Sequence, residues 1–170
     1  TPQTRERIYI VGFKGEAKSQ RICTDNFRKL EKIPLKKGIK DVINKNKQNE
    51  KYYYHKEHQY FPQLKKEMKS DSTVYQWRRV YVRENKSSLC PTLTANMGTG
   101  GHNVPIIKDR YGIRKLTPAE CVAFQGFPKE FQFPSNMANS HCYKQAGNSV
   151  VVPLIKRIAK EISRALDIKY

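Results

Sequence analysis

A short apolar run near the start of the chain constrains the fold more than any other feature. The segment Arg7-Ile-Tyr-Ile-Val-Gly-Phe13 is rich in β-branched and aromatic residues and follows the polar residues 1–6, a pattern typical of a buried strand. A lone strand leaves its backbone donors and acceptors unpaired, so it has to join a sheet formed elsewhere. We therefore expect that part of this sheet lies upstream of the sequence.

Charge limits the class of partner. The 170 residues include 33 Lys and Arg against 15 Asp and Glu, a net charge of +18, which favours polyanions. Hydrophobic residues make up 38% of the chain, below the roughly 45–50% of globular proteins, so we expect a thin or shared core. Neither a membrane span nor a signal peptide fits the sequence, and we expect a cytoplasmic protein without membrane contact.

The cysteines are far apart and form no C-x-x-C pair: Cys23, Cys90, Cys121 and Cys142. Zinc sites and redox motifs depend on such closely spaced pairs. We therefore expect reduced, structural thiols and no metal.

The middle of the chain combines basic and aromatic residues. Residues 28–51 lack apolar periodicity and predict a basic loop, while residues 51–55 add aromatics that suit either base stacking or packing against a small core. Residues 73–83 alternate as one partly exposed strand, from which Arg78 and Arg79 can reach phosphates or form surface salt bridges.

Glycines and other small residues dominate residues 90–102. Such a stretch lets the backbone approach a ligand closely, and we interpret it as a recognition loop, with a flexible hairpin connection as the alternative. It is not a phosphate-binding P-loop, because no Lys-Ser or Lys-Thr closes it.

Two helices are predicted in the last third of the chain. Thr117 as the N-cap, followed by Pro and then by Glu120 at the third helical position, forms a capping box, and this helix should stop at Gly126. An apolar stripe along residues 151–166 predicts an amphipathic helix that Ser149 caps.

Three segments, taken in order, resemble the last three motifs of DNA (cytosine-5) methyltransferases. They are Pro2-Gln-Thr-Arg-Glu-Arg-Ile-Tyr9, then Arg114-Lys-Leu-Thr-Pro-Ala-Glu-Cys121 with Gln125-Gly-Phe-Pro128, then Tyr143-Lys-Gln-Ala-Gly-Asn-Ser-Val150. Thr92 and Leu93 resemble the short fixed element inside the family's variable target recognition domain.

The amino-terminal motifs of that family do not occur in this sequence. They are a glycine-rich cofactor loop, a Pro-Cys nucleophile and a Glu-Asn-Val segment, and Cys90-Pro91 only reverses the nucleophile dipeptide. The resemblance therefore implies a carboxy-terminal part of the enzyme, either a cut fragment or one subunit of a split enzyme. Alone it should be inactive, with the amino-terminal half acting in cis or as a separate subunit.

The resemblance also implies residue roles. In this family a cysteine thiolate attacks C6 of a cytosine flipped out of duplex DNA, and C5 takes a methyl group from S-adenosylmethionine. Gln3, Arg5 and Arg7 match the catalytic Gln-x-Arg-x-Arg motif, so Arg7 would bind the flipped cytosine and Arg5 would hold it or its phosphate. An arginine pair that closes a sheet edge is the alternative.

Two further groups of residues are expected to bind ligands. Asn148 and Ser149 match the element that lies against S-adenosylmethionine, at the start of the last helix, and the missing half would share this cofactor; helix capping by Ser149 is the alternative. The expected DNA-facing residues are Thr92, Leu93, Thr94, Asn96, Gly98, Gly100, Gly101, Arg78 and Arg79.

The expected fold class is α/β, with a mainly β target recognition domain flanked by an edge strand and a C-terminal helix of an S-adenosylmethionine-dependent methyltransferase domain. Residues 1–22 would end the catalytic domain, 23–111 form the target recognition domain, 112–147 connect, and 148–170 return to the catalytic domain. The expected function is cytosine-5 methylation of double-stranded DNA, by resemblance in bacterial restriction–modification. The alternatives are a non-catalytic basic DNA-binding module and a basic protein explained by charge alone.

Overall fold

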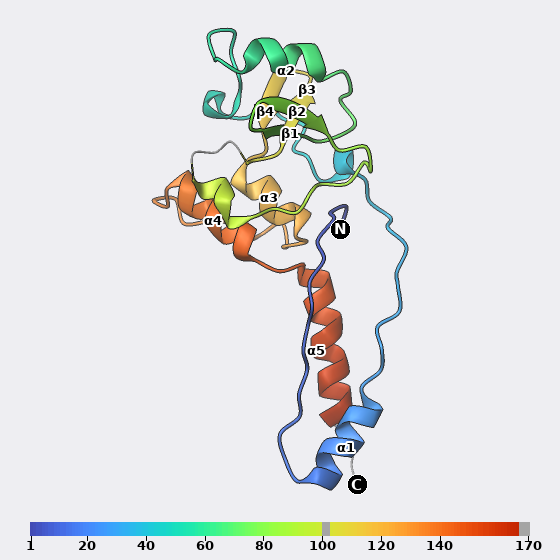
Figure 1. Cartoon of the computed structure of the whole chain (residues 1–170). Helices are drawn as coiled ribbons and strands as arrows, with labels where there is room; N and C mark the ends of the chain where they lie inside the picture. The colour runs from blue at the N-terminus through green and yellow to red at the C-terminus, as the bar shows by residue number, and fades with distance from the viewer. Residues whose placement is uncertain (100–102, 167–170) are drawn as a thin grey trace.

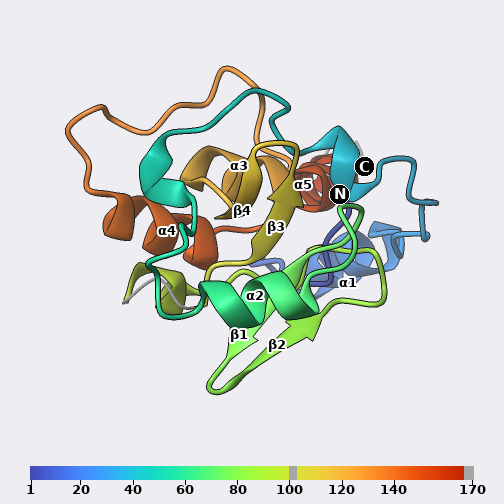
Figure 2. The same cartoon turned by 90° about the horizontal axis from the view of Figure 1, so that it is seen from above.

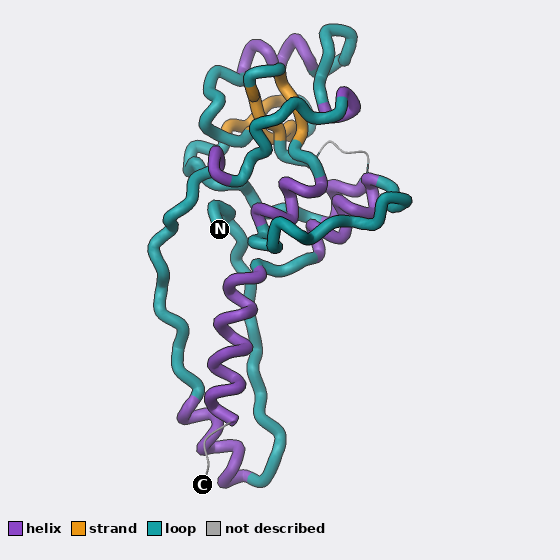
Figure 3. The backbone as a smooth tube through the Cα atoms, turned by 180° about the vertical axis from the view of Figure 1, so that it is seen from behind, coloured by secondary structure: helices purple, strands orange, loops and turns teal. Residues whose placement is uncertain are grey.

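The structure, a computed structural model, describes residues 1–99 and 103–166. It consists of a head that contains a four-stranded sheet and of an arm that extends from it (Figure 1). We define the arm as helix α5 (Val152–Leu166), helix α1 (Ala17–Asn26), which packs against α5, and the extended residues 6–16. Figure 3 shows the same arrangement from behind, with the extended residues running beside α5.

The sheet consists of antiparallel strands in the order β2-β1-β3-β4. Strands β1 (Tyr75–Arg78) and β2 (Tyr81–Glu84) form one hairpin, and β3 (Ile106–Asp109) and β4 (Gly112–Lys115) form a second one. With its helices the chain has the mixed α/β fold expected from the sequence. The domain boundary expected at residue 111 falls inside the second hairpin, because β4 continues the same sheet to Lys115.

Each face of the sheet packs against a different layer, because successive residues of a strand point to opposite faces. One face meets α2 (Phe61–Glu67), which lies in front of β1 and β2 in Figure 2. The other face meets α3 (Pro118–Phe124), α4 (Asn139–Asn148) and the 3-10 helix η3 (Ala95–Gly98). The core on this second side includes Val74, Leu93, Met97, Ile107, Leu116, Val122, Phe124, Tyr143 and Ala146.

The basic segment 28–51 is mostly irregular, as expected, and it contains two short 3-10 helices, η1 (Ile39–Asp41) and η2 (Glu50–Tyr52). Ile39 and Tyr52 anchor these turns in the core. No helix among residues 1–99 and 103–166 has the length and apolar character needed to cross a membrane.

Residues 73–83 form a hairpin, so the prediction of a single strand is wrong. β1 ends at Arg78 and β2 begins at Tyr81, which leaves a turn of two residues between them. Arg79 in this turn has a φ of 54°, a left-handed conformation that usually calls for Gly or Asn. The sequence hides the turn because neither of its residues is a typical turn former and the alternation of side chains continues through it.

Residues 7–13 are extended, but within the described part of the chain they pair with no strand, so the prediction of a buried strand is wrong here. Ile8 and Ile10 are 91% and 93% exposed, whereas the alternate side chains from Tyr9 to Phe13 are half-buried. The physical reason is that a strand forms only when a neighbour satisfies its backbone groups. The described residues offer no such neighbour.

Helix α3 begins and ends as predicted. The Thr117 hydroxyl accepts from the Glu120 amide at 3.2 Å, and the Glu120 carboxylate accepts from the Thr117 amide at 2.8 Å, which completes the capping box. Gly126 has a φ of 79°, the left-handed conformation that favours glycine just beyond a helix.

The last helix begins at Val152, and Ser149 is not its N-cap as predicted. Asn148 is the final residue of α4 and Ser149 is its C-cap, so the chain leaves one helix before it enters the next. The Val151 carbonyl instead accepts from the amides of Leu154 and Ile155, at 3.0 and 3.1 Å. The helical periodicity alone did not resolve this short break.

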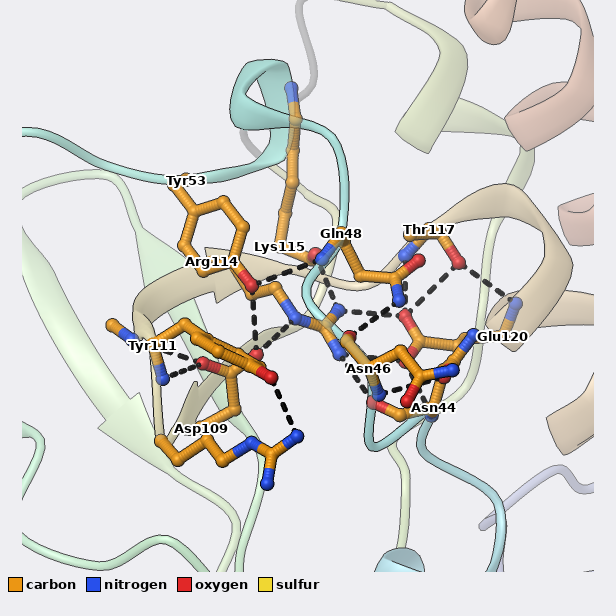
Figure 4. Close-up of polar contacts among 12 residues, drawn as sticks. Asn44, Asn46, Gln48, Tyr53, Asp109, Tyr111, Arg114, Lys115, Thr117 and Glu120 are labelled. Carbon is orange, nitrogen blue, oxygen red and sulfur yellow. Dashed lines mark hydrogen bonds and ion pairs between the residues drawn. The ribbon is translucent and has the colours of Figure 1, made fainter.

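A buried arginine joins the sheet to α3. Arg114 on β4 is fully buried, and its two terminal nitrogens donate to the two carboxylate oxygens of Glu120, each at 2.8 Å (Figure 4). Its Nε donates to Asp109 at 2.7 Å. Burial lowers the pKa of Arg114, but the hydrogen bonds and charges of Glu120 and Asp109 raise the pKa by more, so it lies above its ordinary value.

The Glu120 carboxylate extends this network. Besides Arg114 it accepts from the backbone amide of Thr117 at 2.8 Å and from that of Asn44 at 2.9 Å. One side chain therefore holds the end of the sheet, the start of α3 and the loop at Asn44 in a fixed arrangement.

Glu120→Gln should destabilise the chain strongly. The change leaves the buried Arg114 without one of its two countercharges, and breaking a buried pair costs about 3–5 kcal/mol. Urea unfolding followed by circular dichroism measures the loss. Asp25→Asn is the matched control, because Asp25 pairs with Arg21 at 3.9 Å on the surface and such pairs contribute about 0–1 kcal/mol. Equal midpoints for the two variants would contradict this account.

Candidate functional site

The first motif lies directly beside the Thr92 and Leu93 element. The Thr4 amide donates to the Cys90 carbonyl at 2.8 Å, and the Cys90 amide donates to the Pro2 carbonyl at 2.7 Å, so the two segments pair in parallel around Gln3. The Thr92 hydroxyl adds a hydrogen bond to the Thr4 carbonyl at 2.7 Å. Segments 88 residues apart in sequence are therefore joined here.

Arg5 joins this pair of segments to the end of α4. Its Nη1 donates to the Leu93 carbonyl at 2.7 Å, and its Nη2 donates to the carbonyls of Gly147 and Ser149 at 2.9 and 2.6 Å. Burial, and to a smaller degree the charge of Arg7, lower the pKa of Arg5. The first motif, the Thr92-Leu93 element and the last motif thus meet at one guanidinium, and we take this meeting point as the candidate functional site.

The structure differs from the expectation that Arg5 and Arg7 point together toward a ligand. Both terminal nitrogens of Arg5 donate to backbone carbonyls, so in this structure they are engaged within the chain. Arg7 is exposed, and its Nη1 makes a local bond to the Glu6 carbonyl at 3.2 Å. Of the two arginines, Arg7 keeps a guanidinium that can meet a substrate.

Gln3, the third member of the catalytic motif, has a carboxamide with both polar atoms buried. Within the described residues neither its Nε2 nor its Oε1 has a hydrogen-bond partner. Buried polar groups are normally paired, so this carboxamide is poised for a partner from outside the described chain.

Glycines at the site allow α4 to approach the recognition loop. A Cβ on Gly147 would lie 2.2 to 2.4 Å from backbone atoms of Thr94 and Ala95, and one on Gly98 would lie 2.4 Å from the Ser140 carbonyl. The close approach expected of Gly98 is therefore to a helix of the same chain and not to a sugar-phosphate backbone. This contact makes the loop a packed part of the head.

The other expected DNA-facing residues separate into two groups. Leu93 is fully buried, which corrects its assignment, because its side chain lies in the core below η3. Thr94 and Asn96 are exposed, and Arg78 and Arg79 are exposed at the tip of the β1–β2 hairpin. Gly100 and Gly101 lie outside the described residues.

Asn148 and Ser149 lie at the end of α4 and not at a helix start, so the expected supply of free helix amides is absent there. The Ser149 hydroxyl donates to the Ala146 carbonyl at 2.7 Å and its own carbonyl accepts from Arg5. Ser149 is thus engaged within the chain, whereas the Asn148 side chain is exposed. Asn148 alone fits the expected contact with a small-molecule cofactor.

The thiol of Cys90 does not fit a nucleophile. It is fully buried, and burial raises its pKa well above the ordinary value, so the thiolate that attacks in covalent catalysis is disfavoured. All four cysteines carry free thiols.

Gln125 and Tyr143 belong to the family motifs, and the structure shows contacts for both that the sequence alone does not indicate. The buried Gln125 Nε2 donates to the Ala146 carbonyl at 3.0 Å, and the Tyr143 hydroxyl donates to the Leu116 carbonyl at 2.6 Å. Both bonds fix α4 against α3 and the strand end, and so they set where Gly147 presents its carbonyl to Arg5. For Gln125 the available signal was a polar side chain inside the otherwise apolar Gln-Gly-Phe-Pro motif.

Comparison with known proteins gives a consistent result. The model of the family described as C-5 cytosine-specific DNA methylase matches residues 1–164. Type II methyltransferase M.Bsp6I of Bacillus sp. (strain RFL6) is 54% identical over 167 residues, which cover 97% of this chain and 51% of that protein. M.SsoII of Shigella sonnei is 31% identical over 98% of this chain and 42% of its own length. The chain thus spans about half the length of these relatives.

Solved structures share the fold. A DNMT2 mutant of Spodoptera frugiperda has a TM-score of 0.55 at 18% identity and covers 80% of this chain and 45% of its own. The methyltransferase EhMeth of Entamoeba histolytica has a TM-score of 0.53 at 18% identity, covering 84% and 46% of the two chains.

Gly147→Ala should open the site. An added methyl group meets the Thr94 backbone, which cannot move away as a flexible side chain would, and overpacking of this kind costs about 1–3 kcal/mol. Hydrogen exchange should show faster exchange at residues 2–5 and 90–97, together with a lower urea midpoint. Gly12→Ala is the control, because nothing lies within 4 Å of a Cβ there. Unchanged exchange in the Gly147 variant would exclude the close contact.

Proposed function

Because the chain belongs to the C-5 cytosine-specific DNA methylase family, we propose that it is the carboxy-terminal part of a DNA (cytosine-5) methyltransferase. In this proposal it supplies target recognition and part of the active site, in a bacterial restriction–modification system. The observation that carries the proposal is the meeting, at Arg5, of the first family motif, the Thr92-Leu93 element and the last family motif.

An amino-terminal half completes the enzyme in this proposal, in the same polypeptide or as a second subunit. It supplies the Pro-Cys nucleophile and the glycine-rich cofactor loop, which this sequence lacks. Among the described residues none pairs with residues 7–13 as a strand, and Ile8 and Ile10 expose apolar side chains, which supports the idea. The sheet of the amino-terminal half would supply a strand neighbour for this backbone and cover these side chains.

In this proposal the chain contributes to two domains. Residues 1–22 belong to the catalytic domain, and residues 23 to about 115 form the target recognition domain, with its boundary moved to include β4. The residues that follow, up to 147, connect the two domains. Residues 148–170, which include α5, return to the catalytic domain.

In this proposal two arginines of this chain serve the reaction, Arg5 by ordering the backbone and Arg7 by its positive charge. Arg5 fixes the backbone on both sides of the site. In this proposal the neighbouring, exposed Arg7 guanidinium donates to the carbonyl oxygen of a cytosine flipped from duplex DNA. A positive group at that oxygen stabilises the electron density that the ring gains when a thiolate adds to C6. S-adenosylmethionine, when bound, supplies the methyl group, and the exposed Asn148 carboxamide would contact it.

Duplex DNA is the proposed macromolecular partner, and the net charge of +18 supplies affinity that does not depend on sequence. Each phosphate neutralised by Lys or Arg releases counterions, so binding should weaken steeply as salt rises.

Complementation tests the proposal. We expect tritiated methyl transfer from S-adenosylmethionine to duplex DNA when this chain is mixed with the amino-terminal half of its Bacillus relative, and none from either half alone. Activity of this chain alone would contradict the missing nucleophile. An inactive mixture in which this chain still binds DNA in a salt-sensitive manner would favour the non-catalytic binding module.

Arg7→Gln should separate catalysis from binding. In the active mixture it should lower the rate of methyl transfer on the order of 100-fold, the usual loss for a group that stabilises developing charge, while duplex affinity changes little. Filter binding measures the affinity. Lys14→Gln removes the same charge from the same extended segment and should leave the rate near that of the unchanged chain. Parallel losses of rate and affinity would make Arg7 a simple DNA contact.

A further inference from the structure

A hollow with an aromatic lining lies on the head, and the candidate functional site does not use it. Its volume is about 250 Å³, and its lining includes Tyr53, Tyr54, Phe61 and Tyr111. These residues come from the segment that leads into α2 and from the β3–β4 turn, at the end of the head away from the arm (Figure 1). The aromatic residues of this basic segment suit either base stacking or packing against a core, and the structure separates the two roles.

The packing role belongs to Tyr52, which is 8% exposed and belongs to the core that α3 and α4 share with the sheet. The next two rings, Tyr53 and Tyr54, are only half-buried, and Tyr111 is 43% exposed. The aromatic side chains of the hollow therefore keep surface that the core does not cover.

Hydrogen bonds to one carboxylate fix two of these tyrosines. The Tyr53 hydroxyl donates to Oδ2 of Asp109 at 3.2 Å, and Oδ1 of Asp109 accepts from the amides of Tyr111 and Gly112 at 2.8 and 3.0 Å (Figure 4). Both sides of the hollow are thus tied to the β3–β4 turn. A wall that is already ordered loses little conformational entropy when a ligand binds.

The Tyr111 ring is built as a stacking platform. The Arg110 guanidinium carbon lies 4.7 Å from the centre of the ring, and Nη2 of Arg110 donates to the Tyr111 hydroxyl at 2.6 Å. This cation steadies the ring, which remains 43% exposed as part of the hollow. Aromatic rings supported by arginine are the surfaces on which proteins stack the bases of single strands.

The charged residues of the hollow favour an anion. Lys47, Glu50 and Lys56 lie in its lining, and the Glu50 carboxylate pairs with Lys47 at 2.5 Å. Lys56 is exposed and has no hydrogen-bond or ion-pair partner among residues 1–99 and 103–166. One ammonium group is therefore free beside the aromatic rings, which is the combination that a planar base with a phosphate requires.

We propose that this hollow binds one unpaired nucleobase, with the attached phosphate on Lys56. Its volume is just below the roughly 300–1,000 Å³ of sites that enclose a whole ligand, so we expect it to take the base and leave the sugar and phosphate outside. Stacking accepts any base, because every base has a π-face. This is a second nucleic-acid contact, and it goes beyond the proposed methylation of duplex DNA.

The general attraction of a chain with a net charge of +18 to any polyanion is the competing explanation. Such attraction acts on the phosphates and ignores the bases, whereas stacking requires a base and a ring. A single strand whose sugars carry no bases separates the two explanations, because it keeps every phosphate.

The test measures the fluorescence anisotropy of a labelled single-stranded DNA, and of an abasic strand of the same length, as this chain is added. Tyr111→Leu removes the ring but keeps an apolar side chain. It should weaken binding of the normal strand about 5-fold to 150-fold, the range for one stacked base, and leave binding of the abasic strand unchanged. Tyr111→Phe keeps the ring and should bind both strands like the unchanged chain.

Two control variants separate the hollow from the rest of the surface. Tyr81→Leu removes a ring that is 54% exposed on β2, outside the hollow, and it should leave both affinities unchanged. Lys56→Gln should reduce the slope of log affinity against log salt by about 0.7, the value for one phosphate of a single strand. An unchanged melting temperature shows that each variant is folded.

Photocrosslinking locates the base without any substitution. A single strand that carries 5-bromouracil is irradiated with the unchanged chain, and the modified peptides are identified by mass spectrometry. We expect crosslinks within residues 53–61 or 109–113.

Competition by a free nucleoside 5′-monophosphate identifies the source of the base. If the monophosphate displaces the strand, the hollow takes free nucleotides; if it does not, the hollow takes a base within a strand, and either result supports the inference. Equal affinities of Tyr111→Leu and the unchanged chain for the normal strand, equal losses on the normal and abasic strands, or crosslinks confined to other residues would overturn it. None of these results depends on methyl transfer, so the proposed function is tested separately.

Discussion

The buried charge of Arg114 determines how the head is assembled. A guanidinium without solvent needs countercharges at fixed distances, and Glu120 and Asp109 supply them. This requirement fixes α3 against the sheet. From α3, Gln125 holds the end of α4, and α4 presents the carbonyls that Arg5 binds. The geometry of the candidate site therefore depends, through successive contacts, on the two buried ion pairs of Arg114.

The sequence predicts correctly those structural features that depend on contacts within a few residues. The capping box at Thr117 and the stop at Gly126 are confirmed, because both depend on contacts inside one helix turn. The hairpin at residues 73–83 was missed because Trp77 and Gln63 enforce a turn that the residues at its tip do not favour. The strand at residues 7–13 was mispredicted for a similar reason, since strand formation depends on a neighbour and not on composition.

The residues of the candidate site were identified by motif, but their roles were not. Spacing places Arg5 and Arg7 on one face of an extended segment, yet it cannot tell that three carbonyls from distant segments surround Arg5. Likewise, the run of small residues at 90–102 indicated close approach without naming the partner, which for Gly98 is helix α4 of the same chain. Sequence reasoning thus identifies which groups are special and leaves their contacts to the fold.

The exposed backbone and side chains of residues 7–13 affect how the chain behaves in a cell. An unpaired, apolar, extended segment is the surface through which strands of separate copies add to one another, and Ile8 and Ile10 are almost fully open to this. If an amino-terminal half covers this segment, as proposed above, copies of this chain made in excess of it would tend to aggregate. Under that proposal, matched synthesis of the two halves protects solubility as well as activity.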